Sequence, residues 1–279
     1  MLQQTDRVAR NTFAEPQKAI VTRDGIGSAI LVEQTVTTCC QRLNATDPTL
    51  ALVKRGRKII RTDGQTLVAE EGTVVVFPAG FEADITNEVD RFGKYRALLI
   101  SFSPETINHP VKTDHAPLNE ITSFVDDGLH IAAAMEAALD AIRDQSLPEP
   151  VVKHRVSELL LWLKRQRIFL AAPPASDFLG ELKRLIGSAP ATNWHAPQIA
   201  ATLGMSEATL RRRLAKQKQS VSKLILETRM LTALTLLQAG DQPIVQVSYA
   251  VGYDSPSRFA LRFKQRFGFP PSELRKRSA

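Results

Sequence analysis

Residues 252–275 read GYDSPSRFALRFKQRFGFPPSELR, and this stretch decides the fold of the C-terminal part of the chain. Ser255 is a favourable N-cap, and Pro256 suits the first helical position because its fixed φ fits a helix. Three aromatic residues recur every four positions and should share one buried face: Phe259, Phe263 and Phe267. Gly268 is a typical stop signal. The stretch therefore predicts a helix over residues 256–267.

A shorter apolar helix is expected just before this one, between Pro243 and Val251. Gly252 then supplies a tight turn, so the order is short helix, glycine turn and second helix. That order is the helix-turn-helix layout, which places its second helix in a DNA groove. The second helix leaves its polar residues on the outer face: Ser257, Arg258, Arg262 and Arg266. We expect these side chains to face solvent or a partner.

The same layout occurs a second time at residues 203–214, which read LGMSEATLRRRL. Gly204 supplies the turn, Ser206 is a favourable N-cap, and the second helix is expected to begin at Glu207. Two leucines at i, i+4 spacing form its buried face: Leu210 and Leu214. This arrangement turns three residues outward together: Ala208, Arg211 and Arg212. The outer face of the helix is therefore cationic.

An uninterrupted apolar segment, residues 221–239, joins the two units, which span residues 196–217 and 243–267. The segment contains no Gly or Pro, so we expect one helix of roughly 28 Å at ~1.5 Å per residue. Successive major-groove faces on one side of B-DNA are ~34 Å apart. One rigid helix can therefore hold two DNA-reading helices near neighbouring major-groove segments.

Residues 252–275 resemble the signature of the AraC/XylS family of bacterial transcription regulators, and residues 203–214 resemble its first helix-turn-helix. This resemblance implies an AraC-type DNA-binding domain over residues 177–279. The family often carries an Arg that approaches DNA at the position of Leu261, whereas Arg212 does occupy the matching place in the first unit. The resemblance also implies activation of transcription more often than repression, through contact with RNA polymerase.

The distribution of charge points to the same part of the chain. The 279 residues carry a net charge of +7, yet residues 176–279 hold 16 Lys and Arg against 7 Asp and Glu, a net charge of +9. A basic domain of this kind is typical of a protein that binds the phosphate backbone. A merely solvated basic face and an architectural DNA binder without sequence preference are the alternatives. Two capped recognition helices argue against both.

The N-terminal part contains short β-branched or apolar runs separated by turn signals such as Asp63–Gly64. The clearest runs are residues 49–53, 58–61, 66–69, 73–77 and 95–102. Their spacing favours an antiparallel barrel or sandwich. The part also resembles the cupin-like sensory domain of AraC-type regulators in the segments PTLALVKRGRK (48–58), EEGTVVVFPAG (70–80) and YRALLISF (95–102). We therefore expect a cupin-like antiparallel β-barrel.

Helical periodicity follows in residues 121–170, first in the Ala-rich run 129–142 and then in a second helix after Pro148. The second helix carries a stripe of apolar residues: Val152, Val156, Leu159, Leu163 and Leu170. Such a stripe either packs on the barrel of its own chain or forms a dimer seam, because a/d-like spacing suits helix pairing.

Two domains are expected, joined by a short linker. Residues 1–170 form the cupin-like sensory or dimerisation domain with its flanking helices, and residues 177–279 form the all-α DNA-binding domain. The linker, residues 171–176, is stiffened by Pro173–Pro174. The expected fold class is therefore α+β.

A metal-dependent enzyme is the main alternative for the barrel. Cupin enzymes hold a metal with several His and a carboxylate that face the barrel interior. This chain has five His, none of them between Gln41 and Asn108. We therefore expect no metal, no cofactor and no enzymatic activity, and the alternative is a cupin-type small-molecule enzyme with an appended DNA-binding domain. An apolar barrel mouth is a usual site for a small-molecule effector.

Two groups of residues in the barrel can be interpreted either as functional or as structural. Arg57, Lys58 and Arg61 lie near the expected pocket in sequence, and we expect them on a solvated strand face. Cys39 and Cys40 are adjacent, so they cannot join distant segments by disulfides. We expect both to be buried in a strand rather than to sense redox state or bind metal.

DNA contacts are assigned from the positions on the two recognition helices. Base contacts are expected from Ala208, Arg211, Arg212, Ser257 and Arg258, since Arg binds guanine O6 and N7 bidentately. Phosphate contacts are expected from Ser206, Thr209, Lys216, Ser255 and Lys264. The expected partners are double-stranded DNA, RNA polymerase, a small-molecule effector and a second copy of the chain, at the nucleoid in the cytoplasm. No apolar run approaches the ~20 residues of a membrane span, so no membrane partner is expected.

Overall fold

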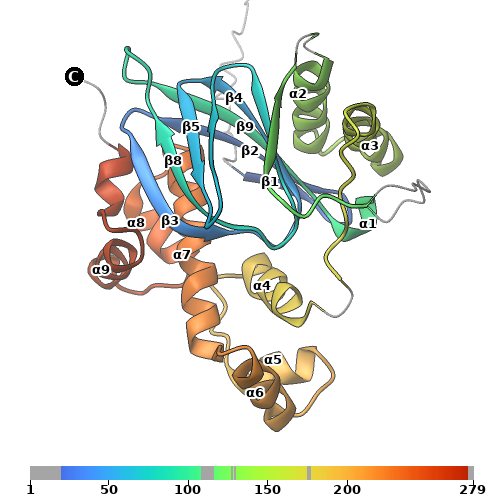
Figure 1. Cartoon of the computed structure of the whole chain (residues 1–279). Helices are drawn as coiled ribbons and strands as arrows, with labels where there is room; N and C mark the ends of the chain where they lie inside the picture. Colours follow the sequence, from blue (N-terminus) through green and yellow to red (C-terminus); the bar gives the residue numbers. More distant parts are fainter. Residues whose placement is uncertain (1–19, 108–115, 127, 129, 175–176, 276–279) are drawn as a thin grey trace, which may run out of the picture.

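The computed structural model describes the chain except residues 1–19, 108–115, 127, 129, 175–176 and 276–279. A β-sandwich with two helices on one side forms the N-terminal part, and helices gathered around one long helix form the C-terminal part (Figure 1). The predicted α+β class is confirmed.

Two antiparallel sheets make up the sandwich. The six-stranded sheet has the order β1 (Ile20–Arg23), β2 (Gly27–Gln34), β9 (Tyr95–Phe102), β4 (Thr49–Arg55), β7 (Thr73–Phe77) and β10 (Thr122–Val125). The four-stranded sheet has the order β3 (Thr38–Asn44), β8 (Glu82–Glu88), β5 (Arg57–Arg61) and β6 (Thr66–Ala69). Among the described residues no pairing joins the two sheets edge to edge, so the expected barrel is two facing sheets rather than a closed one.

Each face of the six-stranded sheet is buried, which is why its central strands are almost wholly apolar. One face packs on the four-stranded sheet, where Val75 and Ala97 meet Ile60 and Ile85. The other face packs on α2 (His130–Arg143) and α3 (Glu149–Arg165).

The apolar stripe of α3 is buried within its own chain: Val152, Val156, Leu159 and Leu163. This is the first of the two arrangements that its spacing allowed. Leu170 lies beyond the end of the helix, although it still packs on the same core. The stretch before α2 is also less helical than expected, because residues 122–125 form the edge strand β10, and α1 (Pro104–Ile107) follows β9.

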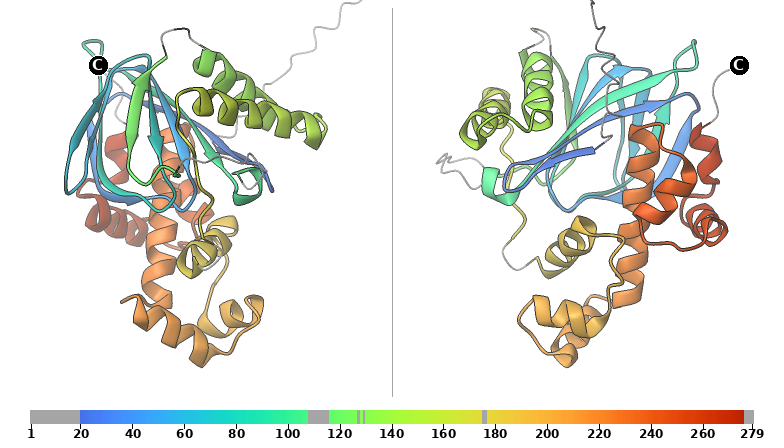
Figure 2. Two further views of the ribbon diagram at one scale, coloured as in Figure 1. Left: turned by 45° about the vertical axis from the view of Figure 1, so that its right-hand side comes forward. Right: turned by 180° about the vertical axis from the view of Figure 1, so that it is seen from behind.

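The C-terminal part follows its sequence signals residue by residue. Its elements are α4 (Phe178–Ser188), α5 (Ala196–Thr202), α6 (Glu207–Lys216), α7 (Val221–Ala239), α8 (Ile244–Ala250), α9 (Pro256–Phe267) and the 3₁₀ helix η1 (Pro271–Arg275). Both views in Figure 2 show α5 and α6 at one end of α7, and α8 and α9 beside its other half. Each group has its own apolar cluster. The predicted pair of helix-turn-helix units joined by a long helix is confirmed.

The two parts of the chain pack against each other. Cys40 and Leu43 of β3 join the apolar cluster around α9. The expected linker lies between α3 and α4, with residues 175–176 outside the described part, and the division into domains stays a prediction. Within the described residues no helix is long and apolar enough to cross a membrane.

The cysteine prediction is half wrong. Cys40 is buried, but its neighbour Cys39 is exposed, because successive residues of a strand point to opposite faces. Both thiols are free. Burial raises the pKa of the Cys40 thiol to about 12, so this group is an apolar filler of the core.

Phe263→Ala tests the importance of the aromatic row in α9. The Phe263 ring is fully buried between Phe259 and Phe267, so removing it should lower the free energy of unfolding by ~3–5 kcal/mol. Leu261→Ala on the same helix is the matched control, and its effect should stay within ~0.5 kcal/mol because Leu261 is exposed. Urea denaturation followed by circular dichroism measures both. Equal effects would contradict the assigned inner face.

Candidate nucleic-acid interface

The first recognition helix, α6, packs on its neighbours through one apolar face and is capped at its N-terminus. The Ser206 hydroxyl accepts a hydrogen bond from the backbone N–H of Thr209 at 3.2 Å, which satisfies one of the free amides of the first turn. Leu210 and Leu214 are buried against α4 and α5. The remaining amides of the first turn point outward at a helix start that favours anions, as a phosphate contact requires.

Three consecutive arginines on α6 have three different surroundings. Arg211 pairs with Glu207 one turn earlier, with Nε 2.7 Å from the carboxylate oxygen. Arg213 lies over the ring of Phe178 in α4, 5.2 Å from its centroid. Arg212 is exposed and makes no hydrogen bond or ion pair with any described residue. Arg212 is therefore the arginine that can reach a base without first breaking a contact.

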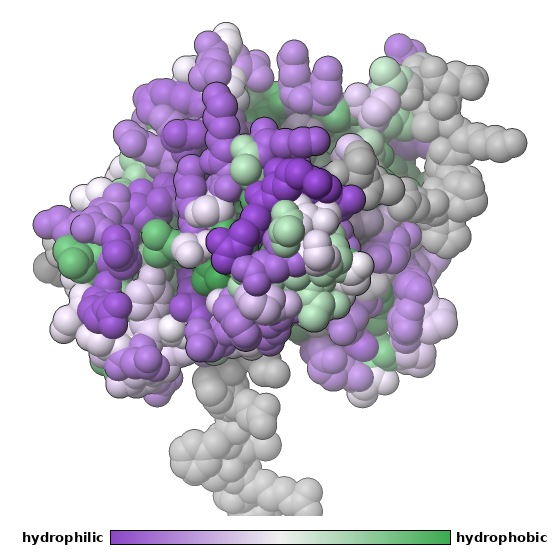
Figure 3. Space-filling model, turned by 90° about the horizontal axis from the view of Figure 1, so that it is seen from below, coloured by the Kyte–Doolittle hydropathy of each residue, from purple (hydrophilic) through white to green (hydrophobic). Residues whose placement is uncertain are grey.

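The exposed pair of Arg211 with Glu207 does not prevent DNA binding. Such an i, i+4 pair stabilises a helix by only ~0.3–0.5 kcal/mol, so a phosphate or guanine can replace the carboxylate. Ala208 and Lys216 are exposed on the same helix. Figure 3 shows mainly hydrophilic side chains over the end of the molecule where α6 lies.

The second recognition helix, α9, is built in the same way. The Ser255 hydroxyl accepts a hydrogen bond from the N–H of Arg258 at 3.4 Å, and Gly268 ends the helix with φ of 84°. Its three phenylalanines are buried. The exposed residues of its outer face are Ser257, Arg258, Leu261, Arg262, Lys264 and Gln265. Both predicted sets of DNA contacts therefore lie on capped helices with their outer faces open.

Arg266 does not face solvent, and its assignment to the outer face was wrong. Its guanidinium binds both carboxylate oxygens of Glu227 on α7 at 2.6–2.9 Å. It also donates to the backbone carbonyls of Gln41 at 2.9 Å and Arg42 at 3.0 Å. These two carbonyls lie at the β-bulge of β3, so Arg266 attaches the second recognition helix to the sandwich.

A second arginine, Arg229 of α7, joins the two units to each other. It donates to the carbonyls of Pro190 at 2.9 Å and Thr192 at 3.0 Å, just before α5, and to the carbonyl of Gly252 at 3.1 Å, in the turn between α8 and α9. Gly252 has φ of 82°, and a Cβ there would lie 2.6 Å from Arg229. The turn therefore needs glycine for both its conformation and the close approach of this side chain.

The first unit also contacts the sandwich. Lys183 of α4 donates to the side-chain oxygen of Asn44 at 2.7 Å, and Arg184 pairs with Asp47 at 3.0 Å. Together with Arg266, these contacts hold both helix-turn-helix units against one sheet edge, near β3 and the loop after it.

An apolar pocket of about 200 Å³ lies between the sandwich and α7. Leu99 and Ile85 contribute from the two sheets, and Leu231 and Leu234 contribute from α7. Lys58 also lines it, although we expected this residue on a solvated face. Lys58 is only 4% exposed, whereas its neighbours Arg57 and Arg61 do face solvent.

The lysine in this pocket is poorly compensated. Its ammonium donates to the side-chain oxygen of Asn87 at 2.7 Å and lies 5.5 Å from the centroid of the Tyr95 ring. No described Asp or Glu forms an ion pair with it. Burial therefore lowers the pKa of Lys58 to about 8. The buried hydroxyl of Tyr95 has no hydrogen-bond partner among the described residues.

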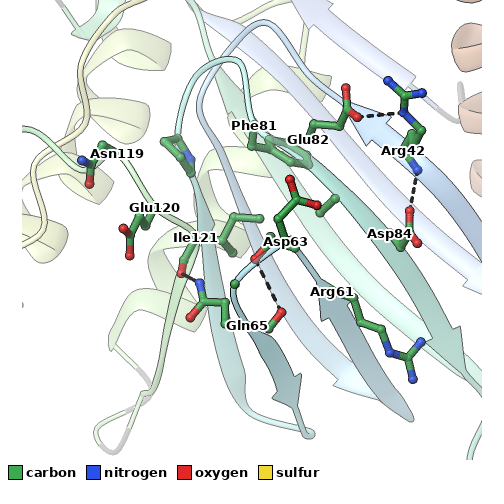
Figure 4. Close-up of a pocket in the computed structure, with 14 residues that line it drawn as sticks. Arg42, Arg61, Asp63, Gln65, Phe81, Glu82, Asp84, Asn119, Glu120 and Ile121 are labelled. Carbon is green, nitrogen blue, oxygen red and sulfur yellow. Dashed lines mark hydrogen bonds and ion pairs between the residues drawn. The ribbon is translucent and has the colours of Figure 1, made fainter.

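A larger groove of about 820 Å³ opens at one end of the sandwich (Figure 4). Several of its polar groups are engaged with one another: Arg42 pairs with Glu82 at 2.8 Å, the Arg42 amide donates to Asp84, and Gln65 donates to the carbonyl of Ile121. Within the described residues no three His, Cys, Asp or Glu side chains come together as metal ligands. The smaller pocket is the better candidate for a ligand, because its buried Lys58 has no carboxylate partner in the described part of the chain.

Comparison with known proteins agrees with this geometry. Residues 199–277 match the family described as a helix-turn-helix domain. The chain is similar to the transcriptional regulator SirC of Salmonella typhimurium, with 35% identity over 112 residues that cover 37% of this chain and 38% of SirC. The chain thus matches well under half the length of that relative. It is also similar to VirF of Shigella flexneri, a virulence regulon transcriptional activator, with 22% identity over 79% of this chain and 88% of VirF.

The fold of the whole chain is also found in a solved structure. ToxT from Vibrio cholerae, with an unsaturated fatty acid bound, matches 90% of this chain and 95% of its own with a TM-score of 0.59 and 15% identity. Such a match shows a shared fold. The protein therefore carries a helix-turn-helix domain at residues 199–277, on a chain that has the fold of ToxT.

Proposed function

We propose that this protein is a sequence-specific DNA-binding transcription regulator that reads two neighbouring major-groove segments. One observation carries the proposal: two Ser-capped recognition helices, α6 and α9, are held at opposite ends of one helix with their basic outer faces open. Helix-turn-helix proteins insert such helices into successive major-groove faces. The similar proteins SirC and VirF are transcription regulators.

The proposed roles follow the outer faces of the two helices. Base contacts come from Ala208, Arg211, Arg212, Ser257 and Arg258, and phosphate contacts from Ser206, Thr209, Lys216, Ser255 and Lys264. Ser206 and Thr209 hydroxyls lie 2.9 Å from each other, so they would bind a phosphate as a pair at the start of α6. Activation through RNA polymerase, formation of a homodimer and action at the nucleoid in the cytoplasm belong to the same proposal.

The pocket beside α7 is proposed as the effector site, for an apolar carboxylic acid. A carboxylate would compensate the buried Lys58, and the apolar walls would cover the rest of the molecule. ToxT, which shares the fold, was solved with an unsaturated fatty acid and with (E)-4-(8-methylnaphthalen-1-yl)but-3-enoic acid, both of them carboxylic acids. The volume of about 200 Å³ is below the ~300–1,000 Å³ of most ligand pockets, so a small acid fits best.

Enzymatic activity is not part of the proposal. The protein is similar to transcription regulators, and the pocket presents one poorly compensated lysine, which suits binding of a carboxylate. Turnover of a small molecule by the purified chain would instead support a cupin-type enzyme with an appended DNA-binding domain.

Replacing two cations of α6 separates base reading from attraction to the backbone. Arg212→Ala should cost ~1–3 kcal/mol on the best site and flatten the preference at one base position. Lys216→Ala should weaken specific and non-specific DNA about equally and lower the salt slope by roughly one. Fluorescence anisotropy over a range of salt concentrations measures both. If Arg212→Ala changes only the salt slope, α6 docks on a different face.

The spacing within the DNA site tests whether α6 and α9 both bind, in two neighbouring major-groove segments; we call this the double-reader model. Protection should fall in two major-groove segments ~10 base pairs apart on one face of the duplex. Inserting five base pairs between them turns one segment to the far side, and because α7 is rigid this should abolish specific binding. A control DNA with a ten-base-pair insertion keeps both segments on one face, but it should also bind poorly because α7 cannot lengthen. Undiminished affinity for both sites would remove the model.

Ligand binding tests the pocket, with octanoate as the probe and octylamine and octan-1-ol as controls. Octanoate alone should bind, and Lys58→Met should weaken it ~10–100-fold, as expected for a hydrogen bond to a charged group. Arg61→Met, on the same strand but exposed, should leave binding unchanged. Affinity should decline as the pH rises through and above about 8, because Lys58 then loses its proton. Calorimetry measures these constants, and tighter octylamine binding would contradict the assignment.

A further inference from the structure

Leu261 is the exposed apolar residue in the middle of the outer face of α9. Its exposed fraction is 58%, and its neighbours on that face are polar or cationic: Ser257, Arg258, Arg262 and Gln265. A single exposed leucine on a protein surface is ordinary. The position of this one within the recognition helix is what points to a function.

The two recognition helices can be matched residue by residue from their caps. Ser206 and Ser255 are the N-caps, and this match places Leu210 on Phe259 and Leu214 on Phe263, all of them buried. It also places Arg212 on Leu261, because each is the sixth residue of its helix. The same match places Thr209 on Arg258. The counterpart of the free arginine of α6 is therefore this leucine and not Arg258.

A leucine at that place recognises a different group on the DNA from the groups that an arginine recognises. Arg binds the acceptors of guanine, whereas an apolar side chain contacts the one apolar group on a major-groove edge, the 5-methyl group of thymine. We propose that Leu261 reads a thymine methyl group in the second major-groove segment, so that α9 selects its sequence by apolar contact. This inference rests on the proposed binding of α9 in the groove.

The residues around Leu261 suit such a contact. Arg258 and Arg262 lie on either side of it along the helix, and Lys264 is exposed near its end. Arg262 donates to Gln265 at 3.1 Å, within the same helix. Arg262 and Lys264 can bind the phosphates and hold α9 in the groove while Leu261 meets the base edge beside Arg258.

The test removes single methyl groups from the DNA. After the best site is selected from random duplexes, each thymine of the second segment is replaced in turn by deoxyuridine, which keeps every hydrogen-bonding group. At one position the wild-type protein should bind about three- to fivefold more weakly, the effect of burying about one methyl group. Leu261→Ala should bind the thymine and deoxyuridine sites equally, with an unchanged salt slope because no charge is removed.

Two control variants sharpen the result. Arg212→Ala should keep the deoxyuridine effect, because it acts in the first segment. Leu261→Arg should shift the selected base toward guanine at the position that lost its methyl sensitivity. Circular dichroism should show all three variants folded, since both side chains are exposed.

The possible failures are distinct. Specific binding with both segments protected, but without loss at any deoxyuridine, would overturn the role of Leu261 and leave the double reader intact. A deoxyuridine effect that survives Leu261→Ala would assign the methyl contact to another residue and overturn the proposal. If Leu261→Ala abolished transcription without changing DNA binding, Leu261 would contact a protein instead of DNA, and the proposal would be overturned. Absence of protection in the second segment would refute binding of α9 itself.

Discussion

The guanidinium of Arg229 is the group on which the relative placement of the two helix-turn-helix units depends. It lies near the middle of α7 and donates to one carbonyl of the second unit and to two carbonyls that precede the first. A planar fork with five donors can satisfy three acceptors at once in a way that the single ammonium of a lysine cannot. Two short helical units, each with its own small apolar cluster, are thereby held in one orientation. The distance between readers is then set by α7 and the angle between them by Arg229.

The same long helix also takes part in two contacts with the sandwich that matter for the proposed function. Glu227 of α7 receives Arg266, which reaches on to the bulge of β3, and Leu231 and Leu234 form one wall of the pocket that contains Lys58. A ligand in that pocket would therefore touch the element that spaces the two readers. Few intermediate residues separate the pocket from the recognition helices, because the pocket, α6 and α9 all pack on α7.

The C-terminal helices could be predicted almost to the residue because their ends are marked by local chemistry. Ser206 and Ser255 cap helix starts, Gly268 ends a helix, and the spacing of the phenylalanines in α9 fixes its buried face. The sandwich was less predictable. β8 alternates polar and apolar residues, and β3 contains a bulge at which Arg42 adopts φ of 50°, so neither gives an apolar run.

The site residues divide along the same line. Exposure of Arg212 and Arg258 followed from helical periodicity, which is a local property. The inward contacts of Arg266 could not be predicted, because its partners lie on α7 and β3, far away in sequence. Lys58 was within reach: it has the same alternation as the buried Ile60, two residues further along β5, and so had to share its inward face. A charged residue at an inward-facing strand position indicates a ligand site, whereas the charge considered alone suggests an exposed side chain.

The sixth residue differs between the two recognition helices, and this difference bears on the orientation of the protein along the DNA duplex. A dimer of identical helix-turn-helix subunits has two-fold symmetry and reads a palindrome the same way from either end. Here the two readers follow one another along a single chain, and one carries Arg212 where the other carries Leu261. A site read by such a chain has a head and a tail. In the proposed mode of binding, one molecule therefore faces a defined way along the duplex.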